Sequence, residues 1–301
     1  MCSINITIFL IKGFHYMFKT LFVTIAFFLG FSQNTINASS DKNNEKILCA
    51  HPQICNLLFL ITPKENVSSV VVFVGDHHHY EPDATVVKTF IQAPLLITGP
   101  KALHPWLINI IKKRSPNTVT FGAEISSTFF QKYQTNNQET LAHFWLYPDI
   151  ACDILMQYKN ELKKINYPTK EISQNACLER FKNISIKMKA ITANIKRPIV
   201  ITHDALLPLF KSLNANVISL KGSSHHEEIA PKVVKTLSQE LKNNSVIWIQ
   251  ENGFEVPHVI KKLIKKDDLV VQVDPNGKMG ENIEETLNQI ALKLSAIQEL
   301  K

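Results

Sequence analysis

The sequence has few glycines, 9 in 301 residues, and it lacks the glycine-based motifs that hold phosphate groups. Neither G-x-G-x-x-G nor G-x-x-x-x-G-K-[ST] occurs, so no nucleotide-binding signature of these kinds is present. The hydrolase motif G-x-S-x-G and the zinc-protease motif H-E-x-x-H are also absent. With 45% hydrophobic and 20% charged residues, the composition is that of a globular protein and excludes a disordered or fibrous one.

The chain also lacks an apolar run long enough to anchor it in a membrane. The run at 20–31 is twelve residues long, whereas a spanning helix needs about 20. Two lysines precede this run and small residues follow it, which is typical of a secretory signal peptide. We expect residues 1–38 to be removed by cleavage after Ala38, with translation starting at Met1 or Met17. The alternative interpretation is a buried hydrophobic helix.

Cysteine is scarce, and its positions fit an exported protein. No cysteine closely follows the apolar run, so we expect a soluble periplasmic protein without a lipid anchor. Four cysteines remain after cleavage, and an even number in an exported chain indicates two disulfides. Of three connectivities we predict the pairs nearest in sequence, Cys49–Cys55 and Cys152–Cys177. Four free thiols are the alternative.

Lysine and arginine give a modest formal charge of +7, and they are scattered rather than clustered with aromatic residues. We therefore expect no nucleic-acid partner. The unusual feature is histidine, which occurs 11 times and partly in clumps, at 77–79 and 225–226.

Short β-branched runs alternate with helical patterns along the mature chain. The runs are nearly continuous in apolar residues, as expected of parallel strands that are covered on both faces. They lie at 69–74, 94–98, 199–202, 217–220, 245–250 and 269–273. One long apolar stripe predicts a helix over about 171–195, and another predicts a final helix around 283–297.

This pattern predicts an α/β fold with two lobes, each a mainly parallel sheet flanked by helices. We expect an N-terminal metal-binding lobe at 39–165, a rigid connecting backbone helix at 166–196 and a C-terminal metal-binding lobe at 197–301.

Histidines and acids follow several of these strands. His77, His78 and His79 come after the 69–74 run, His203 follows the 199–202 run, and Asp274 follows the 269–273 run. In open parallel sheets, ligands bind beyond the carboxyl ends of the strands. Imidazoles with one carboxylate suit tetrahedral zinc, so the spacing favours a metal site. The alternative for each residue alone is a hydrogen-bonded turn histidine.

Four ordered motifs make the sequence resemble a known family. They are HHYEP at 78–82, LHPWL at 103–107, HFWL at 143–146 and THDA at 202–205. The chain is similar to the metal-binding substrate-binding proteins of ABC transporters, the zinc and manganese uptake receptors with a long backbone helix. The resemblance covers nearly the whole mature chain and includes the strand ends at 248–251 and 273–274.

The resemblance implies a ligand set of His78, His143, His203 and Asp274. It places Glu251 beside the ligands without direct contact to the metal. His77 and His79 are candidates for accessory metal capture, whereas His104 and His258 match no ligand position and are interpreted as structural. Two departures stand out: the segment 112–140 has no histidine-rich loop, and Leu141-Ala142 replaces the aspartate that usually precedes the His-Phe-Trp motif.

The implied function is a periplasmic receptor that captures Zn²⁺ between two lobes and delivers it to an ABC permease and its ATPase. Histidine at 203 favours zinc over Mn²⁺ or Fe²⁺, which a receptor of the same fold could also carry. Four protein ligands leave no position for an activated water, so we expect a carrier and no enzyme. We also expect the protein to be a monomer. The alternatives are a zinc-dependent hydrolase with Glu251 as base, and an adhesin or metal buffer without a permease.

Overall fold

The computed structural model describes residues 46–71, 80–136, 138–220, 231–242, 244–252, 256 and 258–297. The expected signal peptide lies outside these residues, and so do His77, His78 and His79. All described residues belong to one compact unit, which comprises residues 43–301. Within them, no helix combines the length and the apolar character that a membrane crossing requires.

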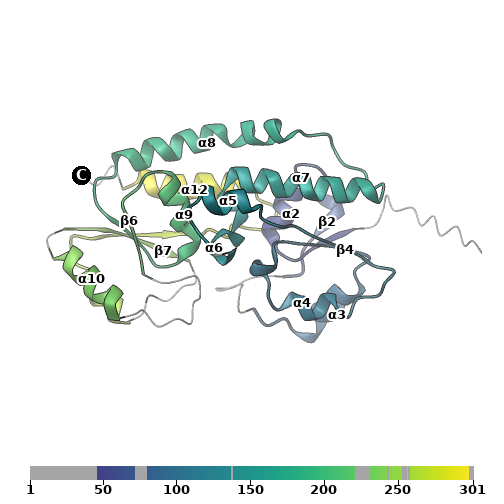
Figure 1. The fold of residues 1–301 in the computed structure, drawn as a ribbon, viewed down its shortest axis with the longest axis horizontal. Helices are drawn as coiled ribbons and strands as arrows, with labels where there is room; N and C mark the ends of the chain where they lie inside the picture. The colour runs from purple at the N-terminus through teal and green to yellow at the C-terminus, as the bar shows by residue number, and fades with distance from the viewer. Residues whose placement is uncertain are drawn as a thin grey trace, which may run out of the picture. The chain divides into compact units, whose positions relative to one another are not determined.

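The fold is α/β, with two four-stranded parallel sheets flanked by helices (Figure 1), as the sequence predicted. The first sheet has the order β2-β1-β3-β4, with β1 at Ile47–Cys49, β2 at Val67–Ser68, β3 at Leu95–Thr98 and β4 at Val119–Gly122. The second sheet has the order β6-β5-β7-β8, with β5 at Ile199–Ile201, β6 at Val217–Ser219, β7 at Ile247–Glu251 and β8 at Leu269–Val273.

The central strands form because their residues are apolar on both faces. Every residue of β1, β3 and β5 is buried, which is the environment that parallel strands between helical layers require. Because all strands run in parallel, their carboxyl ends meet at one edge of each sheet. The polar residues that follow the strands are therefore gathered there.

The helices that flank the sheets lie between successive strands, except that α5 to α8 follow one another between β4 and β5 and α12 follows β8. They are α2 at Pro52–Leu58, α3 at Ala84–Gln92, α4 at Leu107–Ile111, α5 at Ser127–Lys132, α6 at Gln138–Ala142, α7 at Pro148–Lys164, α8 at Gln174–Asn194, α9 at Leu207–Ser212, α10 at Pro231–Leu241, α11 at His258–Lys261 and α12 at Ile283–Ser295. Short 3-10 turns complete them, with η2 at Lys64–Asn66, η3 at Lys101–Leu103, η4 at Phe144–Leu146 and η5 at Asp204–Leu206.

The long backbone helix is α8, which confirms the helix predicted over 171–195. It starts where the Ser173 side chain accepts a hydrogen bond from the backbone N–H of Ala176 at 3.1 Å. Its 21 residues extend over about 31 Å. One face buries Phe181, Ile184 and Met188, and the helix packs against α7 and α12 (Figure 1).

Three strand assignments from the sequence differ from the structure. A strand was predicted at 69–74, but β2 occupies only Val67–Ser68, and residues 69–71 are not in a strand. The strands β1 and β4 were not predicted. The first, Ile-Leu-Cys, has a single β-branched residue, whereas the equally short β5 and β6 contain at least two. It therefore lacks the β-branched run that marks the other strands, although it is central and buried. The second lies at a sheet edge and is only half-buried, so it lacks the continuous apolar run of the inner strands.

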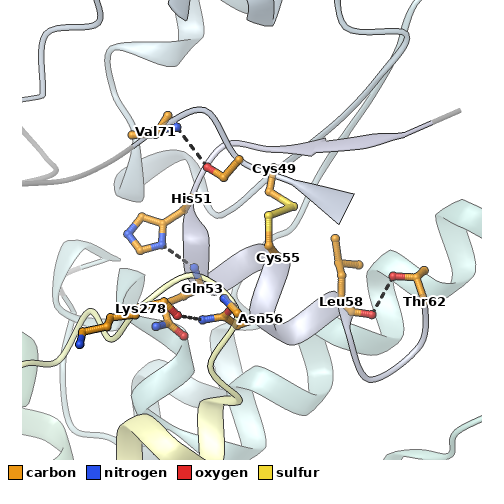
Figure 2. The surroundings of a disulfide bond; sticks show 11 residues. Cys49, His51, Gln53, Cys55, Asn56, Leu58, Thr62, Val71 and Lys278 are labelled. Atoms are coloured by element: carbon orange, nitrogen blue, oxygen red, sulfur yellow. Dashed lines mark hydrogen bonds between the residues drawn. A yellow bond between two sulfur atoms is a disulfide. The ribbon is translucent and has the colours of Figure 1, made fainter. Parts of the chain in front are cut away.

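Both predicted disulfides are confirmed. Cys49 at the end of β1 is bonded to Cys55 in α2, and Cys152 in α7 is bonded to Cys177 in α8. All four residues are fully buried. The first bond holds α2 against the sheet (Figure 2), and the second holds the backbone helix to its neighbour.

Removal of the Cys152–Cys177 bond is expected to destabilise the protein. The bond spans 25 positions of sequence, and the chain-entropy account assigns a loop of this size about 3 kcal/mol. Cys152→Ala/Cys177→Ala should therefore lower the free energy of unfolding by about 3 kcal/mol in a guanidinium titration. The control Lys187→Ala, at an exposed position of α8, should change it by less than about 0.5 kcal/mol. An unchanged free energy in the double variant would contradict this expectation.

A carboxylate in the connection between α7 and α8 carries the clearest charge effect in the described residues. Glu171 accepts hydrogen bonds from Lys159 at 2.7 Å and from Lys163 at 2.6 Å. Lys159 is itself mostly buried and also donates to the carbonyl of Ile172 at 2.7 Å. These two ammonium groups lower the pKa of Glu171 from 4.5 to about 2.

This pKa shift predicts a specific loss of stability in acid. Because the folded state favours the ionised carboxylate, its contribution is fully present above about pH 4.5 and disappears as the pH falls toward about 2. Glu171→Gln should make the thermal midpoint depend less on pH in this window than the parent's does. An identical pH dependence in the two proteins would refute the assignment.

Candidate functional site

A buried histidine–glutamate pair lies at the carboxyl edge of the second sheet. His203 follows β5 and Glu251 ends β7, the strand that pairs with β5. The Nδ1 atom of His203 lies 2.5 Å from Oε2 of Glu251, and each residue is only 3% exposed. Adjacent strands thus bring together two residues that are 48 positions apart in the sequence.

The pair fixes the orientation of the His203 ring. A carboxylate only accepts hydrogen bonds, so Nδ1 of His203 carries a proton and donates a hydrogen bond to Glu251. In the neutral ring, Nε2 then carries a lone pair. A histidine that donates one ring N–H to a carboxylate and presents its other nitrogen is the usual arrangement of a metal-binding imidazole.

His143 lies next to His203. His143 comes after the strands of the first sheet in the chain, whereas His203 follows β5 of the second sheet. His143 connects α6 to η4, is 1% exposed, and its ring centroid is 5.3 Å from that of His203. The helix α6, which precedes His143, also packs against η5, which follows His203. The hydroxyl of Tyr147 donates a hydrogen bond to the carbonyl of Ala205. The pKa of Tyr147 is raised well above its usual value, mainly by burial and secondly by the negative charge of Asp204.

Asp274 is not part of this pair. It follows β8, which β7 separates from β5, so neighbouring-strand spacing puts its backbone about 10 Å from that of His203. The Asp274 side chain is exposed, and its Oδ1 accepts from the N–H groups of Asn276 at 3.0 Å and Gly277 at 3.2 Å. Asp274 also lines a cavity of about 370 Å³ that neither His143 nor His203 lines.

In the described part of the chain, no three His, Cys, Asp or Glu side chains are grouped closely enough to hold a metal ion. The structure brings together His143, His203 and Glu251, and it leaves Asp274 apart. His78, His77 and His79 fall outside the described residues, as do His225 and His226. The ligand set therefore stays a prediction. Two buried imidazoles, one of them oriented by a carboxylate, fit zinc in the chemistry of their donors.

Two further histidines and a tryptophan extend the buried cluster. His51 is fully buried and stacks on the indole of Trp145, with ring centroids 4.6 Å apart. Trp145 also lies edge-on to His143 at 5.4 Å. His104 is 3% exposed and lies 5.5 Å from His51, so it belongs to this cluster and is separate from the surface. His258 begins α11 and is exposed.

His51 has the opposite hydrogen-bonding role to that of His203. Its Nδ1 accepts a hydrogen bond from the backbone N–H of Gln53 at 3.0 Å, which caps α2. The neutral ring therefore carries its proton on Nε2, which makes that nitrogen a donor and not a metal ligand. His51 is absent from the predicted site residues because β1 is not among the strands predicted from the sequence. The rule that polar residues gather after parallel strands would have identified it, since His51 comes two residues after that strand.

Comparison with known proteins points to one family. The family model described as zinc-uptake complex component A, periplasmic, matches residues 58–299. No curated protein sequence matches the chain significantly.

Solved structures with a similar fold have low sequence identity to this chain. A Zn(II)-bound variant of AdcAII from Streptococcus pneumoniae is 18% identical, with a TM-score of 0.62, and the alignment covers 84% of this chain and 99% of that one. The laminin-binding protein Lmb of Streptococcus agalactiae is 17% identical, with a TM-score of 0.63 and coverages of 85% and 98%. The periplasmic zinc-binding protein TroA from Treponema pallidum is 13% identical, with a TM-score of 0.62 and coverages of 84% and 98%.

The orientation of His203 can be tested without any metal. In the metal-free protein at neutral pH, long-range ¹H–¹⁵N correlation spectra should show His203 protonated on Nδ1, because Glu251 accepts from that atom. Glu251→Ala should remove this preference, whereas Glu240→Ala, at a position in α10 away from the pair, should not. A parent ring that carries no proton on Nδ1 would contradict the assignment.

Proposed function

Because the chain belongs to the family of periplasmic zinc-uptake components, the metal-binding receptors of ABC transporters, we propose that it binds Zn²⁺ as its cargo and delivers it to a membrane permease with its ATPase. The observation that carries the proposal is the buried contact of His143 with His203, together with the hydrogen bond of His203 to Glu251. Two buried imidazoles, one of them oriented by a carboxylate, therefore lie side by side.

We assign His143 and His203 as zinc ligands, with His78 and Asp274 completing the set. Support for His143 and His203 comes from their burial and proximity. His78 and Asp274 rest on the family resemblance. A backbone separation of about 10 Å can be spanned by an imidazole and a carboxylate that bind one metal ion between them. Only one of the Asp274 oxygens is engaged by described residues. Glu251 orients His203 and does not itself bind the metal in this proposal.

Zinc is favoured over manganese and iron by the donors. Nitrogen ligands bind Zn²⁺ more strongly than Mn²⁺ or Fe²⁺, while manganese prefers sites dominated by oxygen. A histidine at position 203 increases the nitrogen share of the site.

Two alternatives from the sequence have less support. A hydrolase would need Glu251 as a general base facing substrate, but Glu251 is buried and bonded to His203. An adhesin role finds a parallel in the S. agalactiae protein, which is described as having both adhesin and metal-transporting activity. At 17% identity that likeness concerns the fold, so the receptor function is the one proposed here.

The proposed metal and ligands can be tested by competitive titration of the metal-stripped mature protein. We expect one tightly bound Zn²⁺ per chain and weaker binding of Mn²⁺. His143→Ala and His203→Ala should each weaken zinc binding by more than about 100-fold, since even residues that only support a ligand cost 10- to 100-fold. The matched control is His258→Ala, because His258 is exposed at the start of α11.

Three outcomes would change the proposal. Tight manganese binding with weak zinc binding would replace the metal while leaving the family role intact. Unchanged zinc affinity in His203→Ala would remove that residue from the ligand set. Absence of stoichiometric metal in the parent would refute the function.

A further inference from the structure

The loop between β8 and α12, residues 274–282, is held by side chains from the other end of the chain. Asn56 in α2 donates from Nδ2 to the carbonyl of Lys278 at 2.8 Å and accepts at Oδ1 from the N–H of Gly280 at 2.9 Å. Gln53, one turn earlier in α2, donates from Nε2 to the carbonyl of Asn276. Asn56 and Gln53 are fully buried, and Figure 2 shows both amides facing the loop.

A second contact holds the loop close to Asp274. Trp145 donates from Nε1 to the carbonyl of Pro275 at 2.6 Å, and this bond is buried. Gly277 fits closely under the amide of Gln53, because a Cβ atom there would lie 2.6 Å from Nε2 of Gln53. The backbone of Gly277 has φ +57°, a left-handed conformation that favours glycine. The loop is therefore fixed at successive positions by α2 and η4.

The helix that presents these amides is itself braced. The Cys49–Cys55 disulfide ties α2 to the end of β1, and the His51 ring caps its first turn (Figure 2). A rigid helix can define the position of a loop more precisely than a mobile one. Gln53 and Asn56 are one turn apart, so they face the loop together.

The position of this loop sets the orientation of the Asp274 carboxylate. Its Oδ1 accepts from two N–H groups of the same loop, those of Asn276 and Gly277. The carbonyl of Asn276 in turn accepts from Gln53. Hydrogen bonds thus connect the α2 amides to the carboxylate through the loop backbone, while no described residue bonds to its Oδ2 atom.

We propose that Asn56 and Gln53 are positioning residues for Asp274, which hold its carboxylate where it can bind the cargo metal. This inference rests on the proposed function, since it concerns the acidic ligand of that site. The two amides bind backbone atoms of the loop. The proposed route from them to the metal runs through Asp274, and a route through Trp145 and His143 would persist when Asp274 is changed. A ligand held in place loses less conformational freedom on binding, which increases affinity.

A double-mutant cycle on zinc affinity tests this coupling. Asn56→Ala should weaken zinc binding by about 10-fold or more in the parent. In the Asp274→Asn background, the same change should have less than about a twofold effect, because the ligand that it positions is already altered. A merely structural role would weaken binding equally in both backgrounds. Equal losses in the two backgrounds would overturn the proposal, as would an unchanged affinity of Asn56→Ala.

The matched control is Gln157→Ala. The Gln157 amide makes the same pair of bonds to one backbone residue, donating to the carbonyl of Glu124 at 2.8 Å and accepting from its N–H at 3.0 Å, but it does not contact the 274–282 loop. Its removal should leave zinc affinity within about twofold of the parent value. If Asn56→Ala does not fold, Asn56→Asp takes its place. That variant keeps the acceptor for Gly280 and removes the donor to Lys278.

Hydrogen exchange in the metal-free protein separates this inference from the proposed function. The amides of Asn276 and Gly277 should exchange faster in Asn56→Ala than in the parent and should be unchanged in Gln157→Ala. Unchanged exchange at these amides would overturn the positioning role. If the parent binds no zinc, the proposed function fails, and the exchange rates still decide whether Asn56 holds the Asp274 loop.

Discussion

The candidate site depends on the burial of one indole, that of Trp145. Its face stacks on His51, its edge meets His143, and its N–H bonds the carbonyl of Pro275, the residue after Asp274. An aromatic ring of this size contributes a large apolar surface, but its N–H must find an acceptor when it is buried. Pro275 supplies that acceptor, so the need to satisfy one polar atom joins η4 to the β8–α12 loop. Trp145 thereby contacts both His143 and the residue next to Asp274, so it fixes these two proposed ligands relative to each other.

The histidines of this site are distinguished by what their Nδ1 atoms do. His203 donates to Glu251, while His51 accepts from the backbone of α2. Two chemically identical side chains in one buried cluster therefore present opposite atoms, a lone pair in one case and a proton in the other. Whether a buried histidine can bind a metal depends on which ring nitrogen carries the lone pair, and the hydrogen-bond partners of the ring decide that. This is why the extra buried histidine His51 does not by itself enlarge the metal site.

Much of the fold could be predicted from the sequence, because the inner strands are apolar on both faces and α8 has a clear stripe. Both disulfides followed from the number and spacing of cysteines. The short strand β1 could not be found, because Ile-Leu-Cys contains a single β-branched residue, and His51 was missed with it. The contact of His143 with His203 was expected through the resemblance, since residues 60 positions apart have no local signal of proximity. The separation of Asp274 from them follows from strand order, which the sequence does not specify.

The α2 amides recognise the β8–α12 loop through its main chain, and this has a consequence for sequence drift. Carbonyl and N–H groups are present whatever side chain a residue carries, so positions 276 and 278 could change in related proteins without losing these bonds. Gly280, which donates the third bond, has φ +92°, a conformation that favours glycine. Gly277 is constrained by its backbone angle, and Asn56 needs both a donor and an acceptor on one short side chain. In a divergent family, the loop could therefore vary widely in composition around an invariant path, with the selective constraint falling on α2 instead.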